Sequence, residues 1–226
     1  MCGRFAITLP VEAMAQLFAA APANDLPEVP NYNVCPTTQI HTIMATDNGR
    51  QLGAMRWGFI PTWYKKPNDG PLLINARAET IAQKPAFSKA CRERRCLIPM
   101  SGFYEWTKTP EGAHLPWYIT PRHEEVAVFA GIWQDWEHDG VRLKTAAIVT
   151  VAANKTMSKI HKRMPVSLAP DQWASWLGEQ GKGAARLMQP APEDRFAAWR
   201  VSPEVNSNRA SGEQLIRSLE ADNSGY

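Results

Sequence analysis

Six short runs of β-branched and aromatic residues, separated by Gly, Pro, Asn and Asp, constrain the fold more than any other feature of this sequence. They are QIHTIMAT (39–46), GAMRWGFI (53–60), CLIPMSGFYEW (96–106), PWYIT (116–120), VAVFAGIW (126–133) and LKTAAIVTVAA (143–153). Runs of this length and composition, bounded by turn-forming residues, predict strands. The strands do not alternate strictly with helices, so a doubly wound parallel sheet does not fit. The sequence predicts an α+β fold with a mostly antiparallel, barrel-like β core and flanking helices.

Helices are predicted at four places between and after these strands. Residues 11–20 follow a proline and carry Met14, Leu17 and Phe18 at helical spacing. Residues 78–87, 170–178 and 212–221 are the other three predicted helices. The chain shows no internal repeat and no low-complexity linker, so we expect one domain over residues 1–226, with about 217–226 as a frayed tail.

Composition and cysteine usage exclude several classes of protein. No apolar run approaches the roughly 18 residues of a membrane span, and the N-terminus lacks the pattern of a signal peptide. The expected location is therefore the cytoplasm, with nucleoid association in a bacterium or a nuclear location in a eukaryote. The four cysteines are expected to be free thiols. The spacing of Cys91 and Cys96 does not match a zinc site, so neither a metal nor another cofactor is expected.

The positive charge of the chain is concentrated in one stretch. Residues 51–100 hold nine Lys or Arg residues against three acidic residues, although the net charge of the whole chain is only +3. Within this stretch, Trp63 and Tyr64 are interleaved with cations and adjoin a polar loop. Aromatic rings that stack on bases beside cations that meet phosphates are typical of single-stranded nucleic acid binding. A solvated helix face explains the charge alone equally well, and Trp57 and Phe59 fit a core.

Cys2 can give the N-terminus an unusual chemical reactivity. If the initiator methionine is removed, one residue carries both a thiol and a free α-amine. The α-amine has an ordinary pKa near 7.7–8.0, and nearby cations such as Arg4 can lower the pKa of a thiol. Such a 1,2-aminothiol can act as an N-terminal nucleophile, or condense with an aldehyde to a Schiff base and then a five-membered thiazolidine. A chance cysteine after methionine is the alternative.

Three further segments carry residues that suit acid–base chemistry. Asn75 and Arg77 alternate along an expected strand end, so their side chains should face the same way, although Asn75 can instead bond the backbone of a turn. Glu105 lies between two aromatic residues. It is either exposed at a strand edge or held in a partly apolar pocket with a raised pKa, where it can move protons. His161 lies in a basic, proline-ended segment that suits a loop beside an anion.

Together these segments resemble the SRAP family, the SOS-response-associated peptidase fold. The motifs MCGRF, YNVCPT, MRWGFIPTWY, LINARAET, SGFYEW and IHKRMPV occur in order, and the resemblance runs from residue 2 to about residue 210. Members of this family crosslink covalently to abasic sites in single-stranded DNA.

The resemblance implies a role for each of these residues. Cys2 matches the nucleophile, which closes a thiazolidine on C1′ of the ring-opened abasic sugar. Asn75 matches the asparagine that orients the N-terminal residue, Glu105 the glutamate that moves protons, and His161 the histidine near the sugar hydroxyl. The positions that grip phosphates or wedge against the strand are Arg4, Trp63, Tyr64, Arg77 and Arg163. The implied partner is single-stranded DNA with abasic sites, including junctions with duplex, bound by a monomer.

Two other classes of function remain open at this point. Class II glutamine amidotransferases also begin with Met-Cys-Gly and use the cysteine as nucleophile, but they typically continue with an aliphatic residue and a glycine where this chain has Arg4 and Phe5. A non-covalent module for modified DNA would keep the cations and aromatic residues but leave Cys2 unexplained.

Overall fold

The computed structural model describes residues 2–219, and it is built around a closed β-barrel. Five strands form the ring: β4 (Gln39–Thr46), β5 (Gly49–Trp57), β7 (Arg95–Met100), β10 (Ala127–His138) and β11 (Val141–Ala152). Four of the five junctions are antiparallel. The parallel pairing of β11 with β5 closes the ring. The predicted α+β fold with a mostly antiparallel, barrel-like core is confirmed.

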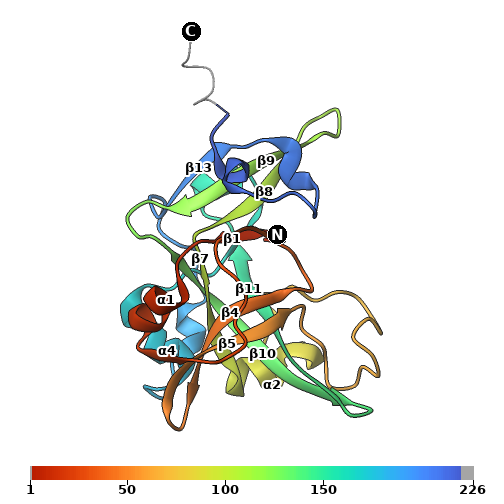
Figure 1. Ribbon diagram of the computed structural model, residues 1–226, viewed down its shortest axis with the longest axis vertical. Coiled ribbons are helices and arrows are strands. Elements are labelled where there is room, and N and C mark those ends of the chain that lie inside the picture. The colour runs from red at the N-terminus through yellow and green to blue at the C-terminus, as the bar shows by residue number, and fades with distance from the viewer. Residues whose placement is uncertain (1, 220–226) are drawn as a thin grey trace.

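A second sheet of five strands stands above the barrel in the view of Figure 1. Its strands, in spatial order, are β13 (Phe196–Arg200), β9 (His114–Pro121), β8 (Gly102–Lys108), β1 (Phe5–Ile7) and β3 (Asn31–Val34). The expected run 96–106 is therefore two strands, β7 and β8, which belong to different sheets. At Gly102 a Cβ would lie 2.3 Å from the Tyr118 ring, so only glycine fits where the chain enters the second sheet.

Two short strands extend the barrel on one side. β6 (Asn75–Arg77) pairs in parallel with β11, and β12 (Arg163–Pro165) pairs antiparallel with β11. Thr150 of β11 is in register with both Arg77 and Pro165. This arrangement brings segments that are almost ninety positions apart in the sequence onto either side of one strand. On the far side of the barrel, β2 (Ala20–Pro22) pairs with β5.

Of the four α-helices within residues 2–219, one begins later than its predicted range and one was not predicted. α1 (Val11–Phe18) and α4 (Trp173–Leu177) lie within the predicted segments, and α3 (Lys155–Ser158) is a single turn. α2 (Pro85–Glu93) begins seven residues later than predicted. Lys84 is extended because the residue before a proline is disfavoured in helical conformation, and Pro85 suits the first turn of a helix.

The predicted C-terminal helix is only a 3₁₀ turn over Glu213–Ile216. Leu219, which falls in the expected frayed tail, donates its backbone N–H to the carbonyl oxygen of Arg200 in β13 at 3.0 Å. The remainder of that predicted tail lies outside the described residues.

The core fills the barrel and continues into the contact with the second sheet. Trp57, which fits a core by sequence, is fully buried, and its ring lies 5.2 Å from that of Phe5 in β1. Phe59 is also buried. β1 thus packs against the barrel while it pairs with β3 and β8. This packing holds the residues that precede β1 in a buried position, although the start of a chain usually frays.

Candidate functional site

Cys2 is buried beside the first residue of β6. Its side chain is 1% exposed. The Nδ2 atom of Asn75 donates a hydrogen bond of 2.9 Å to the backbone carbonyl oxygen of Cys2. The Oδ1 atom of Asn75 is buried and has no hydrogen-bond partner among the described residues. Asn75 therefore fixes the backbone of Cys2 and keeps one acceptor unused at the same place. Asn75 bonds the distant N-terminal backbone, and not a local turn.

Glu105 lies in β8, opposite Trp117 of β9, and is buried. Burial raises the pKa of its carboxyl group above the ordinary value, because the charged form loses its hydration. This environment matches the partly apolar pocket and excludes the exposed strand edge. Burial also raises the pKa of the Cys2 thiol far above its usual range, and the nearby Glu105 raises it further. The thiol is therefore protonated at neutral pH and needs a base before it can react.

His161 lies in the loop between α3 and β12, next to Glu105. Its Nδ1 atom is 3.8 Å from Oε1 of Glu105. The backbone N–H of Arg163 approaches the same Nδ1 atom at 3.0 Å. The carbonyl oxygen of Arg163 lies 3.1 Å from the same Nδ1 atom, so the backbone of Arg163 contacts this ring nitrogen through both groups. The site therefore brings together a thiol, a carboxyl group and an imidazole from three distant segments. These groups can exchange protons, as a proton-transfer centre requires.

A cavity of about 530 Å³ opens beside this centre. Asn75 and Arg77 both contribute to its wall, which confirms that their side chains face the same way. Trp63 forms another part of the wall. The other residues that line the cavity were not predicted as site residues from the sequence. They are Leu73, Thr80, Lys84, Pro85, Ala86 and Phe87. Apart from the Lys-Pro pair that starts α2, nothing in the sequence marks them as neighbours of Asn75.

The two adjacent aromatic residues of the loop between β5 and β6 differ in exposure. Trp63 is 56% exposed. Tyr64 is only partly exposed, and a Cβ at Gly70 would lie 2.1 Å from its hydroxyl oxygen, so the ring folds back over its own loop. The carbonyl oxygen of Tyr64 also accepts a hydrogen bond from the Trp136 indole at 2.8 Å. Trp63 is the ring that is available to stack on a ligand.

The three arginines that the resemblance assigns to phosphate contacts lie in different environments. Arg77 is exposed at the cavity. Arg4 is buried, and its guanidinium donates to Oδ1 of Asn33 at 2.6 Å and to Oδ1 of Asn208 at 2.5 Å. The backbone N–H of Arg4 lowers the pKa of the Cys2 thiol, but burial and Glu105 outweigh this effect, and the Arg4 guanidinium is bound to Asn33 and Asn208. Arg163 donates two hydrogen bonds to Glu79.

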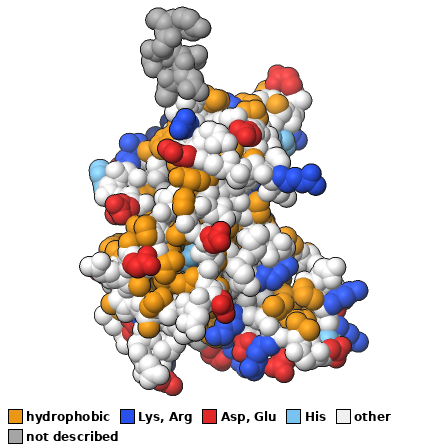
Figure 2. All heavy atoms as spheres, in the orientation of Figure 1, with side chains coloured by type: hydrophobic (Ala, Val, Ile, Leu, Met, Phe, Trp, Pro, Cys, Tyr) orange, Lys and Arg blue, Asp and Glu red, His pale blue; other side chains and the backbone are white. Residues whose placement is uncertain are grey.

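Charged side chains of both signs occur on the face of the molecule shown in Figure 2. Lys and Arg lie mainly toward the lower right of that face, next to hydrophobic side chains and with Asp and Glu among them.

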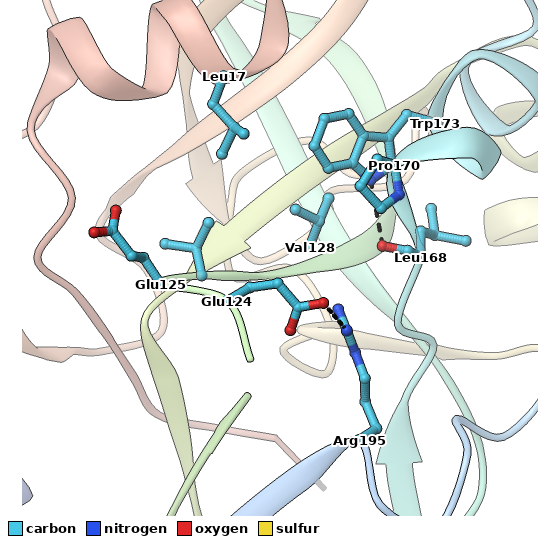
Figure 3. A pocket seen from close by; sticks show the side chains of 9 residues that line it. Leu17, Glu124, Glu125, Val128, Leu168, Pro170, Trp173 and Arg195 are labelled. Atoms are coloured by element: carbon cyan, nitrogen blue, oxygen red, sulfur yellow. Dashed lines mark hydrogen bonds and ion pairs between the residues drawn. The ribbon is translucent and has the colours of Figure 1, made fainter. Parts of the chain in front are cut away.

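A second cavity, of about 230 Å³, lies between α1, α4 and the residues that precede β10 (Figure 3). Its walls are mostly apolar, including Leu17, Val128 and Trp173. Asn75, which contacts Cys2, lines the first cavity and not this one, so we place the chemistry at the Asn75 cavity.

Within residues 2–219, no group of three or more His, Cys, Asp or Glu side chains lies close enough together to hold a metal ion. In the same part of the chain, no helix is both long enough and apolar enough to cross a membrane.

The chain is similar to known proteins in both sequence and fold. The family model described as SOS response associated peptidase (SRAP) matches residues 1–208. The abasic site processing protein YoqW of Bacillus subtilis is 36% identical over 225 residues, covering 96% of this chain and 100% of YoqW. The abasic site processing protein YedK of Escherichia coli is 30% identical, covering 96% and 99%. A crystal structure of a protein from Bacteroides thetaiotaomicron has a TM-score of 0.85 at 23% identity, covering 96% and 99%.

Proposed function

The chain belongs to the SRAP family, and from this premise we propose that it processes abasic sites in DNA by bonding Cys2 covalently to the sugar aldehyde. The observation that carries the proposal is the buried contact of Asn75 with Cys2 beside Glu105. The names of the relatives YoqW and YedK supply the abasic site as the substrate.

The proposed reaction joins an aldehyde to a 1,2-aminothiol and releases one water molecule. After removal of Met1, which lies outside the described residues, the α-amine of Cys2 adds to C1′ of the ring-opened sugar. The resulting hydroxyl group leaves as water when it accepts a proton, and a protonated Schiff base forms. The thiol sulfur then adds to C1′, loses its proton, and closes the thiazolidine. The ring nitrogen keeps its own hydrogen, so atoms and charges balance.

Glu105 suits both proton transfers of this sequence. Its raised pKa favours the protonated carboxyl group more than in an ordinary glutamate, which suits it to supply the acid for the departing hydroxyl. The carboxylate that remains then accepts the proton of the Cys2 thiol. That thiol needs such a base because its own pKa is raised. One residue thus returns to its starting state at the end of the reaction.

His161 and Asn75 assist at the sugar and at the amine. Opening the sugar ring transfers a proton to the ring oxygen, and the His161 imidazole can donate it. The unpartnered Oδ1 atom of Asn75 can accept a hydrogen from the Cys2 amine, which directs the nitrogen lone pair toward the aldehyde. Arg77 and Trp63 line the adjacent cavity, where they would contact a phosphate and an unpaired base of single-stranded DNA.

Mass spectrometry tests this function directly. The protein with a free Cys2 is mixed with a single-stranded oligonucleotide that contains one abasic site. We expect an adduct on the N-terminal peptide, with the summed mass of the two molecules less one water. The matched control is the same oligonucleotide with a tetrahydrofuran analogue, which has no aldehyde. An adduct at another cysteine, or glutamine hydrolysis without any adduct, would contradict the proposal and favour a different use of Cys2.

A further inference from the structure

A third cavity, of about 460 Å³, lies at the C-terminal end of α2, and the charged side chains that line it are all cations. Arg92 comes from the end of α2, Arg95 begins β7, and Lys182 lies in the loop after α4. The uncharged part of the wall includes Cys91 and Trp176. This space, the Arg95 cavity, is large enough for a small ligand, since such sites span about 300–1,000 Å³.

The acidic residues nearest to these cations in the sequence are paired with other arginines. Glu93 contacts Nη1 of Arg94 at 3.4 Å. Glu179 accepts two hydrogen bonds from Arg50, at 2.8 and 2.7 Å. Within residues 2–219, none of the three cations of the Arg95 cavity forms an ion pair. The positive charge of this cavity therefore has no compensating charge in the described part of the chain.

Arg95 is half-buried, and backbone carbonyl groups hold its guanidinium. Nη1 donates to the carbonyl oxygens of Cys91 at 3.0 Å and of Arg92 at 2.6 Å, and Nε donates to that of Trp176. Burial lowers the pKa of this guanidinium, because the charged form loses hydration. A charge in such a place is normally paired with an opposite charge. An anion that enters the cavity would meet a cation that is already ordered, which favours binding.

The loop after α4 adds backbone donors to the same wall. The N–H groups of Gly181, Lys182 and Gly183 donate to no acceptor within residues 2–219. Consecutive N–H groups of this kind can form concave sites for anions. Phosphate accepts hydrogen bonds on several oxygens at once, and a guanidinium can bind it through two parallel N–H groups. The donors of the Arg95 cavity therefore match a phosphate group.

We propose that the Arg95 cavity is a second phosphate-binding site, separate from the Asn75 cavity. The ligand is a phosphate group, either of a small phosphorylated molecule or of a DNA strand that continues past the Asn75 cavity. Helix α2 connects the two cavities, because Phe87 lines one and Arg92 lines the other. Five residues of helix span about 7.5 Å. The proposal gives a role to cations of the basic stretch 51–100 that the proposed function does not use.

The thiol of Cys91 lines the cavity, so its reactivity reports whether the cavity is occupied. The rate of labelling by a maleimide is measured with peptide mass spectrometry while inorganic phosphate replaces chloride at constant ionic strength. We expect labelling of Cys91 to slow by about tenfold when free phosphate is about nine times its dissociation constant, as mass action requires. Cys35 is also partly exposed but does not line the cavity, so its labelling should stay unchanged.

Removal of the two exposed cations tests the site while Arg95 and its carbonyl contacts stay in place. In the double variant Arg92→Gln/Lys182→Gln, phosphate should no longer protect Cys91, because each charge-assisted hydrogen bond that is lost weakens binding by about tenfold or more. Arg92 also influences the pKa of the Cys91 thiol. Protection is therefore the ratio of the labelling rates without and with phosphate, measured for each variant.

Two matched controls remove a charge from outside this cavity. Lys89→Gln removes an exposed cation from the same helix, at a position that does not line the Arg95 cavity. Arg77→Met removes the cation of the Asn75 cavity. Both variants should keep the full protection of Cys91 by inorganic phosphate. A loss of protection in Arg77→Met would place the phosphate in the Asn75 cavity and overturn the inference.

The same labelling with DNA distinguishes the two sources of phosphate. Protection by a single-stranded oligonucleotide with the tetrahydrofuran analogue, lost in the double variant, would identify phosphates of the strand. Protection by inorganic phosphate but not by this oligonucleotide would identify a small phosphorylated ligand.

Two results would overturn the site itself. One is unchanged labelling of Cys91 in the parent with both inorganic phosphate and the oligonucleotide. The other is protection that survives in Arg92→Gln/Lys182→Gln. The readout does not involve an adduct at Cys2, so failure of the proposed function and failure of this inference are distinguished.

Discussion

Asn75 and Cys2, which are 73 positions apart, are joined by a hydrogen bond of 2.9 Å from the Asn75 side chain to the Cys2 backbone. The acceptor is a main-chain oxygen, so the bond does not depend on the thiol. It positions the backbone from which both reactive groups of Cys2 extend. A substitution of the Cys2 side chain should therefore leave this hydrogen bond, and the position of the backbone, unchanged.

Replacement of the thiol should abolish the stable product without moving the backbone. In Cys2→Ser the amine remains, so a Schiff base can form, but a hydroxyl group does not close a stable ring. We expect no heat-stable adduct, and a product that appears only after borohydride reduction. Gel electrophoresis after heating, with and without borohydride, measures both. Equal yields of heat-stable adduct from Cys2→Ser and from the parent would rule out the thiazolidine.

Loss of the Asn75 amide should slow the reaction more than it lowers stability. Asn75→Ala removes the hydrogen bond to Cys2 and the unused acceptor, so the N-terminal amine loses its direction. A net hydrogen bond contributes about 0.5–1.5 kcal/mol to stability, which predicts a modest drop in melting temperature. The crosslinking rate constant should fall by about 100-fold. Asn75→Asp keeps the shape but lacks the N–H donor, and a fully active Asn75→Asp variant would show that the bond is dispensable.

Glu105→Gln should lower the crosslinking rate and raise the stability of the fold at neutral pH. The raised pKa means that the folded protein holds this proton more tightly than the unfolded chain does. Stability therefore falls as pH rises from the ordinary glutamate pKa of about 4.3 toward the raised value. Gln carries no such proton, so the variant should lose less stability over that range. Crosslink formation and reversal should both slow by about 10²–10⁴-fold.

Melting curves of Glu105→Gln and the parent between pH 4 and 8 supply the measurement. Glu12→Gln, at an exposed position of α1, controls for the loss of a carboxylate. A parallel pH dependence of the parent and Glu105→Gln would mean that folding does not raise the pKa of Glu105, which would remove the basis for its role as an acid.

Arg4 and Arg77 should respond in opposite ways to removal of their charge. Arg77→Met should reduce the salt slope of single-stranded DNA binding by about 0.7 and leave the melting temperature unchanged. Arg4→Met leaves buried acceptors at Asn33 and at the backbone carbonyl oxygen of Val205 without a donor, which costs about 1–3 kcal/mol. It should lower the melting temperature by several degrees and leave the salt slope unchanged. A loss of salt dependence in Arg4→Met would identify Arg4 as a phosphate contact.

Trp63 should determine the preference for single strands. Stacking on a free base face contributes about 1–3 kcal/mol, and a continuous duplex hides such faces beside the abasic site. Trp63→Ala should therefore slow crosslinking on single-stranded and junction substrates toward the rate on duplex. Leu17→Ala, at an exposed apolar position away from this cavity, is the control. Rates on matched oligonucleotides give the comparison. A strand preference that survives in Trp63→Ala would exclude this ring as its source.

The fold class follows from the sequence because it rests on local patterns, whereas the residues of the centre were assigned by the resemblance to the SRAP family. The β-branched runs and their turn residues predicted the strands, and Trp57 and Phe59 were expected in the core, where they lie. Lys84 and Pro85 show the limit of such patterns. The residues from 78 to 84 suit a helix by composition, but the helix starts only at Pro85, since proline blocks the helical conformation of the residue before it.

The environment of each charged side chain was decided only by the tertiary structure. Arg4, Arg77 and Arg163 are the same residue type, yet Arg4 binds Asn33 and Asn208, Arg163 binds Glu79, and Arg77 faces the cavity. Glu105 had two possible environments by sequence and was found in the buried one. Hydrophobic periodicity is a property of neighbouring residues, so a sequence contains it directly. Burial and ion pairing depend on which distant segments meet, and here the closure of the barrel and the pairing of β6 and β12 with β11 decide that.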